Sequence, residues 1–330
     1  MKVRAWAELL RVSALFTVPG DALAGAAALG VRPGRGTALA VGSSLCLYEA
    51  GMALNDWADR EEDARDRPHR PIPSGRISPR AALAAAGALT AAGLALASRA
   101  GRPALVVSTA LAATVWAYDL KLKHTLAGPA AMGAARALDL VLGAVATVPS
   151  AGPSVRAALP SAAILGAHTA AVTTVSRREA EGGSTAAPLA ALAATIALGA
   201  VTARRTWSPQ SPDRLDVLSS IAGRAESAPA DGHKPALQAR PAIEDTSGHR
   251  PRLVTAALTA AYVATAAKPL AHAVLNPSPP LTQRAVGGGI RAMIPLQGAL
   301  AARGGAVAVG LGVMGLVPIA RALARKVSPT

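Results

Sequence analysis

The sequence predicts an all-helical integral membrane protein with about nine transmembrane helices. Of its 330 residues, 51% are hydrophobic and only 16% are charged, and Ala, Leu, Val and Gly are abundant. These proportions are typical of membrane proteins. The apolar residues also gather into segments close to the roughly 20 residues that a helix needs to cross a bilayer.

The apolar segments follow one another along most of the chain, although the many alanines give several of them only weak hydropathy. Nine segments are predicted to span the membrane: residues 12–30, 37–54, 81–98, 103–118, 129–148, 157–175, 186–203, 253–275 and 304–320. They divide the chain into helices one to seven over residues 1–205, a hydrophilic loop over 206–252, and helices eight and nine over 253–330. The loop is rich in Pro, Ser, Asp and Arg and is predicted to be flexible.

The first apolar segment also has features of a signal peptide. Lys2, Arg4 and Arg11 precede it, and the Ala-Leu-Ala of residues 22–24 resembles a cleavage site. The apolar stretch continues beyond that site to Gly30. This length favours an uncleaved first helix.

The most informative segment lies between the second and third predicted helices. Its aspartates are spaced 3, 4 and 3 residues apart, which places them on one face of a helix: Asp56, Asp59, Asp63 and Asp66. Clustered carboxylates repel one another unless a cation lies between them. Carboxylates beside an amide, here Asn55, suit Mg²⁺, which completes its coordination with waters and substrate phosphates. The arginines that follow can neutralise phosphate oxygens: Arg60, Arg65, Arg67, Arg70 and Arg76.

The same segment could be an ordinary basic loop, since runs of charge are usually solvated. The order of its parts favours a specific site: N-D-x-x-D-x-x-x-D, then R-P-x-R-P-I, then S-G-R-I-S. This ordered pattern resembles the first aspartate-rich motif of the UbiA superfamily of intramembrane prenyltransferases. The resemblance is carried by Asn55, Asp56, Asp59, Asp63, Arg67, Arg70, Pro71, Gly75 and Ser78.

The resemblance implies a UbiA-like helical bundle with a lateral opening to lipid and a polar cap over a central cavity. It implies Mg²⁺-dependent transfer of a prenyl group from an isoprenoid diphosphate to a lipophilic or aromatic acceptor, with membrane lipid as a further partner. The metal would be held by Asp56, Asp59 and Asp63. The diphosphate would be held by Asn55, Arg67 and Arg70 together with basic residues of later loops.

The loop after the fourth predicted helix is the second place where binding groups gather. Residues 118–125 read Y-D-L-K-L-K-H-T and resemble the UbiA-family tyrosine that is followed by a basic residue and a threonine. The resemblance assigns Tyr118 to the catalytic site and Lys121 and Lys123 to the diphosphate. The alternative is that these cations only anchor the loop at the membrane boundary.

Charged residues inside the predicted spans are further candidates, for an acceptor-binding cavity. Arg136 and Asp139 would each cost about 2.5–3.5 kcal/mol at a helix centre on insertion scales. They should therefore face the bundle, where they pair with one another or Arg136 points at an anionic substrate group. Glu49 lies on the same helical face as Asp56 and deeper in the membrane. It either orients a polar substrate or hydrogen-bonds a neighbouring helix.

A second aspartate-rich motif, expected after the sixth helix in the UbiA family, is altered here. The family pattern is roughly D-x-E-x-D before a glycine, whereas residues 177–182 read R-R-E-A-E-G. Glu179 and Glu181 match the last two acidic positions, but Arg177 stands where the first aspartate belongs. A cation there opposes a second Mg²⁺ and can itself contact diphosphate. We predict a one-metal enzyme, with a non-catalytic protein that binds or transports a prenylated lipid or other lipophilic metabolite as the alternative.

The C-terminal part indicates a branch of the family. Residues 284–297 read R-A-V-G-G-G-I-R-A-M-I-P-L-Q. Together with S-R-R-E-A-E-G-G over 176–183 and G-P-A-A-M-G over 128–133, this stretch resembles the UbiA-like branch often called EboC. The resemblance to this branch implies no particular substrate.

The distribution of Lys and Arg predicts the orientation in the membrane. Basic residues are more frequent on the side of the aspartate-rich segment, which predicts that the active-site loops lie in the cytoplasm. We expect the membrane to be a bacterial cell membrane. The net charge of +15 could also indicate nucleic acid, but the chain has only four Trp, three Tyr and one Phe to stack bases. Anionic lipid head groups and a diphosphate explain the charge better, and no nucleic-acid partner is expected.

Overall fold

The computed structural model describes residues 2–148, 154–177, 179, 182–204 and 249–319, and over these residues the regular structure is entirely helical. Seven helical segments are long and apolar enough to cross a membrane, and each corresponds to a predicted span. They are Arg35–Ala58, Pro79–Ala100, Arg102–Leu122, Gly128–Thr147, Val155–Ser176, Ala186–Ala203 and Pro251–Leu275. The predicted fold class is confirmed. The predicted hydrophilic loop lies outside the described residues up to 248, and its last residues begin a helix.

The helices follow in chain order, with short turns of 3₁₀ or π geometry (η) between some of them. They are α1 (Lys2–Leu9), η1 (Val12–Thr17), α2 (Pro19–Ala28), α3 (Arg35–Ala58), α4 (Arg60–Asp66), α5 (Pro79–Ala100), α6 (Arg102–Ala117), η2 (Tyr118–Leu122), α7 (Gly128–Thr147), η3 (Val155–Ala158), α8 (Leu159–Ser176), α9 (Ala186–Ala203), α11 (His249–Leu275), α12 (Pro279–Arg303) and α13 (Val307–Met314).

Helix α12 was not predicted as a span, and it is the last long helix of the bundle. It has 25 residues and packs against α11, α2 and α8. Its hydropathy is low because it carries Arg284, Arg291 and Gln297. Gln297 is fully buried and hydrogen-bonded inside the bundle, so protein rather than lipid surrounds it. The segment predicted as the ninth span, residues 304–320, instead contains the short apolar helix Val307–Ile319.

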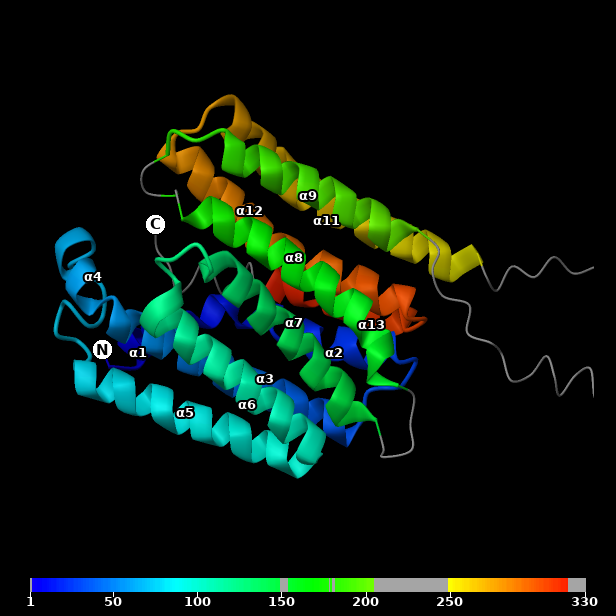
Figure 1. Cartoon of the computed structure of the whole chain (residues 1–330), viewed down its shortest axis with the longest axis horizontal. Helices are drawn as coiled ribbons and strands as arrows, with labels where there is room; N and C mark the ends of the chain where they lie inside the picture. The colour runs from blue at the N-terminus through cyan, green and yellow to red at the C-terminus, as the bar shows by residue number, and fades with distance from the viewer. Residues whose placement is uncertain (1, 149–153, 178, 180–181, 205–248, 320–330) are drawn as a thin grey trace, which may run out of the picture.

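The long helices form two groups that meet along the middle of the bundle (Figure 1). Helices α3, α5, α6 and α7 lie in one group, and α8, α9, α11 and α12 lie in the other. Helix α2 lies between them and packs against both α7 and α12. The two large apolar clusters follow this division, and each also contains residues of α2 and α7. The first predicted span, now seen as η1 and α2, is therefore part of the core.

Small residues let the helices approach closely, which explains why the chain is rich in Ala and Gly. Gly143 of α7 lies against the backbone of Ala22 in α2, with no room for a Cβ. Gly133 of α7 and Gly166 of α8 face each other in the same way. In a bilayer, helices associate through such close packing because lipid tails are as apolar as the side chains.

The N-terminal helix α1 covers the end of the bundle that carries the aspartate-rich segment. Its Ala5 and Leu9 are buried in an apolar cluster with residues of α3 and α5. Glu8 binds Arg76 with both carboxylate oxygens, at 2.6 and 3.0 Å. This hydrogen-bonded pair lowers the pKa of Glu8, so its contribution to docking α1 is present above the ordinary pKa of glutamate and is lost as the pH falls through the lowered value.

Replacing Gly143 by Ala is expected to lower the thermal unfolding temperature of the protein in detergent, because the added Cβ would overlap the backbone of Ala22. Overpacking of this kind costs about 1–3 kcal/mol. Gly87→Ala is the matched control, since Gly87 lies in α5 and a Cβ there meets no atom within 4 Å. Equal unfolding temperatures for the two variants would rule out the close contact between α2 and α7.

Candidate functional site

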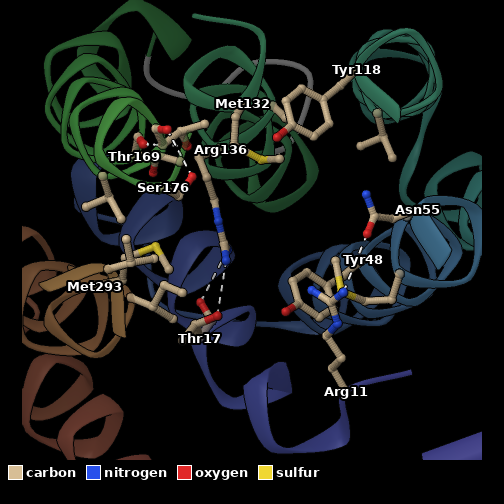
Figure 2. Close-up of a pocket in the computed structure, with 18 of the residues that line it drawn as sticks. Arg11, Thr17, Tyr48, Asn55, Tyr118, Met132, Arg136, Thr169, Ser176 and Met293 are labelled. Atoms are coloured by element: carbon tan, nitrogen blue, oxygen red, sulfur yellow. Dashed lines mark hydrogen bonds between the residues drawn. The ribbon is translucent and has the colours of Figure 1, made fainter. Parts of the chain in front are cut away.

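A cavity of about 810 Å³ lies inside the bundle and is lined by residues of η1, α3, α6, α7, α8 and α12. Much of its wall is apolar: Leu47, Met52, Leu111, Val115, Met132, Val172, Val286, Ile290 and Met293. Polar groups gather in two places. One is the end of α3, where Asn55 and Arg11 lie close together, and the other is deeper, around Arg136 (Figure 2).

The aspartate-rich segment is interrupted at Asp59, and its four carboxylates do not share one environment. Helix α3 ends and α4 begins on either side of Asp59, whose φ and ψ are −86° and 4°. Asp59 lines the cavity together with Asn55. Asp56 and Asp63 are buried among arginines, and Asp66 is exposed. The interruption thus separates one carboxylate that faces the cavity from three that do not line it.

Arginines neutralise Asp56 and Asp63. Arg70 Nη1 lies 2.7 Å from Asp63 Oδ2 and 3.6 Å from Asp56 Oδ1. Arg67 Nη1 lies 3.6 Å from Asp63 Oδ1, and Arg11 Nη2 lies 3.2 Å from Asp56 Oδ1. The assignment of Asp56 and Asp63 to a metal ion stays a prediction, and it requires these arginines to move.

Arg11 is a site residue that sequence reasoning missed. It comes from the junction of α1 and η1, lines the cavity, and places Nη2 3.5 Å from Asn55 Oδ1 (Figure 2). Its backbone has φ 48° and ψ 47°, a left-handed conformation that is uncommon for a residue with a Cβ and recurs at functional sites. In the sequence it appears only as part of the basic flank of the first span, 44 residues before Asn55.

The π-helical turn η2 brings the second predicted loop to the same end of the cavity. Tyr118 lines the cavity, as does Asp119, whose Oδ1 accepts a hydrogen bond from Asn55 Nδ2 at 3.2 Å. Lys123 Nζ is bonded to Asp59 Oδ1, while Lys121 is exposed. Asp119 is the second residue that sequence reasoning missed, because an acid between Tyr and Lys at a membrane boundary has no distinctive pattern.

The altered second motif contributes one of its predicted side chains to the cavity. Glu179 lines it, and burial raises the pKa of this carboxyl above its ordinary value although Arg67 opposes the shift. Arg177 is exposed, and its Nη2 lies 3.5 Å from the backbone oxygen of His124. Glu181 lies outside the described residues.

The predicted pair between Arg136 and Asp139 does not form. Arg136 Nη1 donates to Asp21 Oδ2 at 2.5 Å, and Asp139 accepts a hydrogen bond from Ser44. The reason is that α2 brings the fully buried Asp21 against α7, where Gln297 also donates to Asp21 Oδ1 at 2.6 Å. Arg136 and Asp139 both line the cavity, so the alternative in which Arg136 faces a substrate stays open.

Glu49 is buried, and neither of its carboxylate oxygens has a hydrogen-bond partner among the described residues. The predicted hydrogen bond to a neighbouring helix is therefore not formed. Glu49 is also not among the residues that line the cavity. A role in orienting a substrate stays a prediction.

The cavity thus brings together eight of the predicted site residues: Asn55, Asp59, Arg67, Arg70, Tyr118, Arg136, Asp139 and Glu179. The oxygens at its polar end fit a hard divalent cation, because Asn55 and Asp59 lie one helical turn apart and both face the cavity. The nearby guanidinium groups of Arg11, Arg67 and Arg70 fit phosphate oxygens. The donor set as a whole therefore suits Mg²⁺ bound together with a diphosphate.

Comparison with known proteins identifies the family. The profile of the UbiA prenyltransferase family matches residues 13–208, more than half of the chain. The digeranylgeranylglyceryl phosphate synthase of Ignicoccus hospitalis is 35% identical over 156 residues, which cover 47% of this chain and 51% of the relative. That of Methanopyrus kandleri is 37% identical over 128 residues, or 37% of this chain and 45% of the relative.

A shorter match, 40% identical over 70 residues, relates the chain to the bacteriochlorophyll synthase 33 kDa chain of Rhodobacter capsulatus and covers 21% of this chain and 23% of the relative. The chain therefore aligns with about half or less of the length of these curated relatives.

Solved structures share the fold over nearly the whole chain. A UbiA homolog from Archaeoglobus fulgidus bound to DMAPP and Mg²⁺ has a TM-score of 0.55 at 17% identity, over 94% of this chain and 99% of that one. A structure of digeranylgeranylglyceryl phosphate synthase has a TM-score of 0.54 at 17% identity, over 93% and 99%. With the profile match and the ordered aspartate-rich segment, these findings show that the chain belongs to the UbiA prenyltransferase family.

Proposed function

We propose that the protein is a Mg²⁺-dependent intramembrane prenyltransferase that moves a prenyl group from an isoprenoid diphosphate to a lipophilic or aromatic acceptor. The observation that carries this proposal is the distribution of apolar and charged side chains along the cavity wall. Its wall is largely apolar, whereas one end gathers Asn55 and Asp59 with the arginines Arg11, Arg67 and Arg70. An isoprenoid diphosphate has the matching distribution of an apolar tail and an anionic head.

The polar end binds and orients the diphosphate in this proposal. Arg11 and Arg70 hold phosphate oxygens through charge-assisted hydrogen bonds, which are stronger than neutral ones. Asn55 and Asp59 would hold Mg²⁺, which would supply positive charge to balance the charge that develops on the leaving diphosphate. Lys123, which neutralises Asp59 in the structure, is then available for the diphosphate as well.

The reaction breaks the bond between C1 of the prenyl group and the bridging oxygen, and the electron pair leaves with the diphosphate. The allylic cation then forms a bond with the acceptor, which releases a proton. The apolar wall of Met132, Val172 and Met293 keeps water from the cation. Holding acceptor and cation side by side supplies much of the rate.

The deeper polar group is the proposed site for the polar part of the acceptor. Ser44, Tyr48, Arg136 and Asp139 all line the cavity there. Arg136 is already paired with Asp21, which compensates its charge. The N–H groups of the guanidinium that are not engaged in the protein can donate hydrogen bonds to the acceptor. This arrangement favours an acceptor with a hydrogen-bonding head on an apolar body.

A non-catalytic protein that binds or transports a prenylated lipid is the second candidate. The observation that favours it is Arg177, which occupies the position of an aspartate in the family's second motif. Purified protein that releases diphosphate from farnesyl or geranylgeranyl diphosphate only with Mg²⁺ present would support the enzyme. We also propose an EboC-like branch within the family, on the basis of residues 128–133, 176–183 and 284–297. The relatives described above bear the names of other members of the family.

We also propose that the end of the bundle carrying α1, α4 and η2 faces the cytoplasm of a bacterial cell. The segment between α3 and α5 is its main support, because its basic residues are the densest of any connection described: Arg60, Arg65, Arg67, Arg70 and Arg76. The diphosphate released by the reaction would then enter the cytoplasm.

Asp59→Asn is expected to abolish Mg²⁺-dependent binding of a non-hydrolysable prenyl diphosphate, because it removes a carboxylate that faces the cavity. Calorimetric titration with and without Mg²⁺ measures this loss. Asp66→Asn is the matched control, since Asp66 belongs to the same run of aspartates but is exposed on α4. If both variants bind the analogue with the parent's affinity in the presence of Mg²⁺, the assignment of Asp59 to the metal is wrong.

Arg177→Ala is expected to weaken binding of the same analogue by about 1.5–3 kcal/mol, the worth of a hydrogen bond to a charged group. Arg177→Asp should recover affinity only at raised Mg²⁺, because it restores an acidic residue to the second motif. Arg156→Ala is the control, because Arg156 is exposed on η3. If Arg177→Ala binds as tightly as Arg156→Ala, Arg177 is an interfacial anchor and the non-catalytic candidate gains support.

Cysteine labelling in intact cells tests the orientation. After Cys46→Ala removes the single native thiol, Ser74→Cys should resist an impermeant thiol reagent and Ser154→Cys should react. Both serines are exposed, and they lie in connections at opposite ends of the bundle, before α5 and before η3. The reverse labelling pattern would overturn the proposed orientation.

A further inference from the structure

Asp119 is a buried carboxylate at the polar end of the cavity that the proposed reaction does not yet use. Its side chain lines the cavity, and the residue is only 4% exposed. Oδ1 accepts a hydrogen bond from Asn55, whereas Oδ2 accepts none from the described residues. Oδ2 is not among the fully buried atoms that lack a partner, so it is open to the cavity that Asp119 lines. An oxygen in this position is therefore suited to a ligand inside the cavity.

Two local features direct Asp119 toward the end of α3. It lies in η2, a π-helical turn. Such turns are rare in proteins as a whole, but they often occur at functional sites. On α3, Gly51 leaves space opposite it, since a Cβ there would lie 3.9 Å from Asp119 Oδ2 and 3.0 Å from Val115. The carboxylate is thus held against the segment of α3 that also carries Asn55.

The charged groups around Asp119 would accommodate a divalent cation. Asp59 repels it, and Lys123 and Arg11 attract it. Both of these cations are already engaged with aspartates of the first motif, Lys123 with Asp59 and Arg11 with Asp56. A divalent ion near Asp59 would compensate both carboxylates and free the two cations for phosphate oxygens.

The structure assigns Asp119 as a metal ligand: we propose that it binds the divalent cation together with Asp59 and Asn55. It would supply from η2 a carboxylate of the kind that the second motif lacks at Arg177. The inference rests on the proposed function and deepens it. The metal ligands would come from the end of α3 and from η2, instead of from two aspartate-rich motifs. Oxygen ligands of this kind suit Mg²⁺ and Mn²⁺ alike.

Titration with Mn²⁺, followed by electron paramagnetic resonance of the free ion, tests the assignment without relying on activity. The full-length protein in detergent is saturated with inorganic diphosphate, and its Mn²⁺ affinity is compared with those of Asp119→Asn and Asp119→Ala. Both variants are expected to bind Mn²⁺ at least tenfold more weakly than the parent, because each removes the charged ligand. Thermal unfolding of each variant confirms that it is folded.

The pair of substitutions separates a ligand from a residue that only positions Asn55. The amide of Asp119→Asn can still accept the hydrogen bond from Asn55, so a positioning role predicts parent-like affinity for Asp119→Asn and a loss only for Asp119→Ala. That result, or parent-like affinity in both variants, would overturn the assignment. Asp66→Asn, an exposed carboxylate of α4 that does not line the cavity, is the control and should bind Mn²⁺ within twofold of the parent.

Failure of the proposed function gives a different pattern. A parent protein that binds no Mn²⁺ in the presence of inorganic diphosphate overturns both the metal-dependent function and the role of Asp119. A parent that binds Mn²⁺ through Asp59, with Asp119→Asn unaffected, overturns the role of Asp119 alone.

Discussion

The ion pair between Arg136 and Asp21 joins the helices that enclose the cavity. Asp21 is fully buried in α2, Arg136 lies in α7, and Gln297 of α12 bonds the same carboxylate. Because an uncompensated charge inside the bundle is expensive, removing one partner of such a pair typically costs about 3–5 kcal/mol. This requirement fixes α2 against α7 and α12, and Gly143 of α7 lies directly against Ala22 of the same helix α2.

The same requirement organises the polar end of the cavity. Asp56, Asp59 and Asp63 each have a cationic partner, namely Arg11, Lys123 and Arg70. These pairs stabilise the clustered carboxylates in the described structure. They also keep several cations next to the place proposed for the diphosphate, so a metal ion that replaces them at the carboxylates would release them toward phosphate. The left-handed backbone of Arg11 is consistent with a residue held in place for such a purpose.

The fold could be predicted from the sequence to the extent that apolar length determines it. Seven spans were recognised because they are long and uncharged, whereas α12 was missed because Arg284, Arg291 and Gln297 lower its hydropathy, although Gln297 is bonded inside the protein. In the site, Asn55 and Asp59 were found from a local motif. Arg11, Asp21 and Asp119 were missed because their partners lie 44 to 276 residues away, where no sequence spacing indicates the contact.

Asp59 and Asn55 are proposed to hold a divalent cation against a diphosphate at the polar end of the cavity. Anomalous diffraction from crystals grown with Mn²⁺ and a non-hydrolysable prenyl diphosphate tests this directly. We expect a manganese peak within bonding distance of an Asp59 carboxylate oxygen, with diphosphate oxygens completing its coordination. A manganese peak elsewhere, or diphosphate bound in the cavity with no metal beside Asp59, would contradict the proposed metal site.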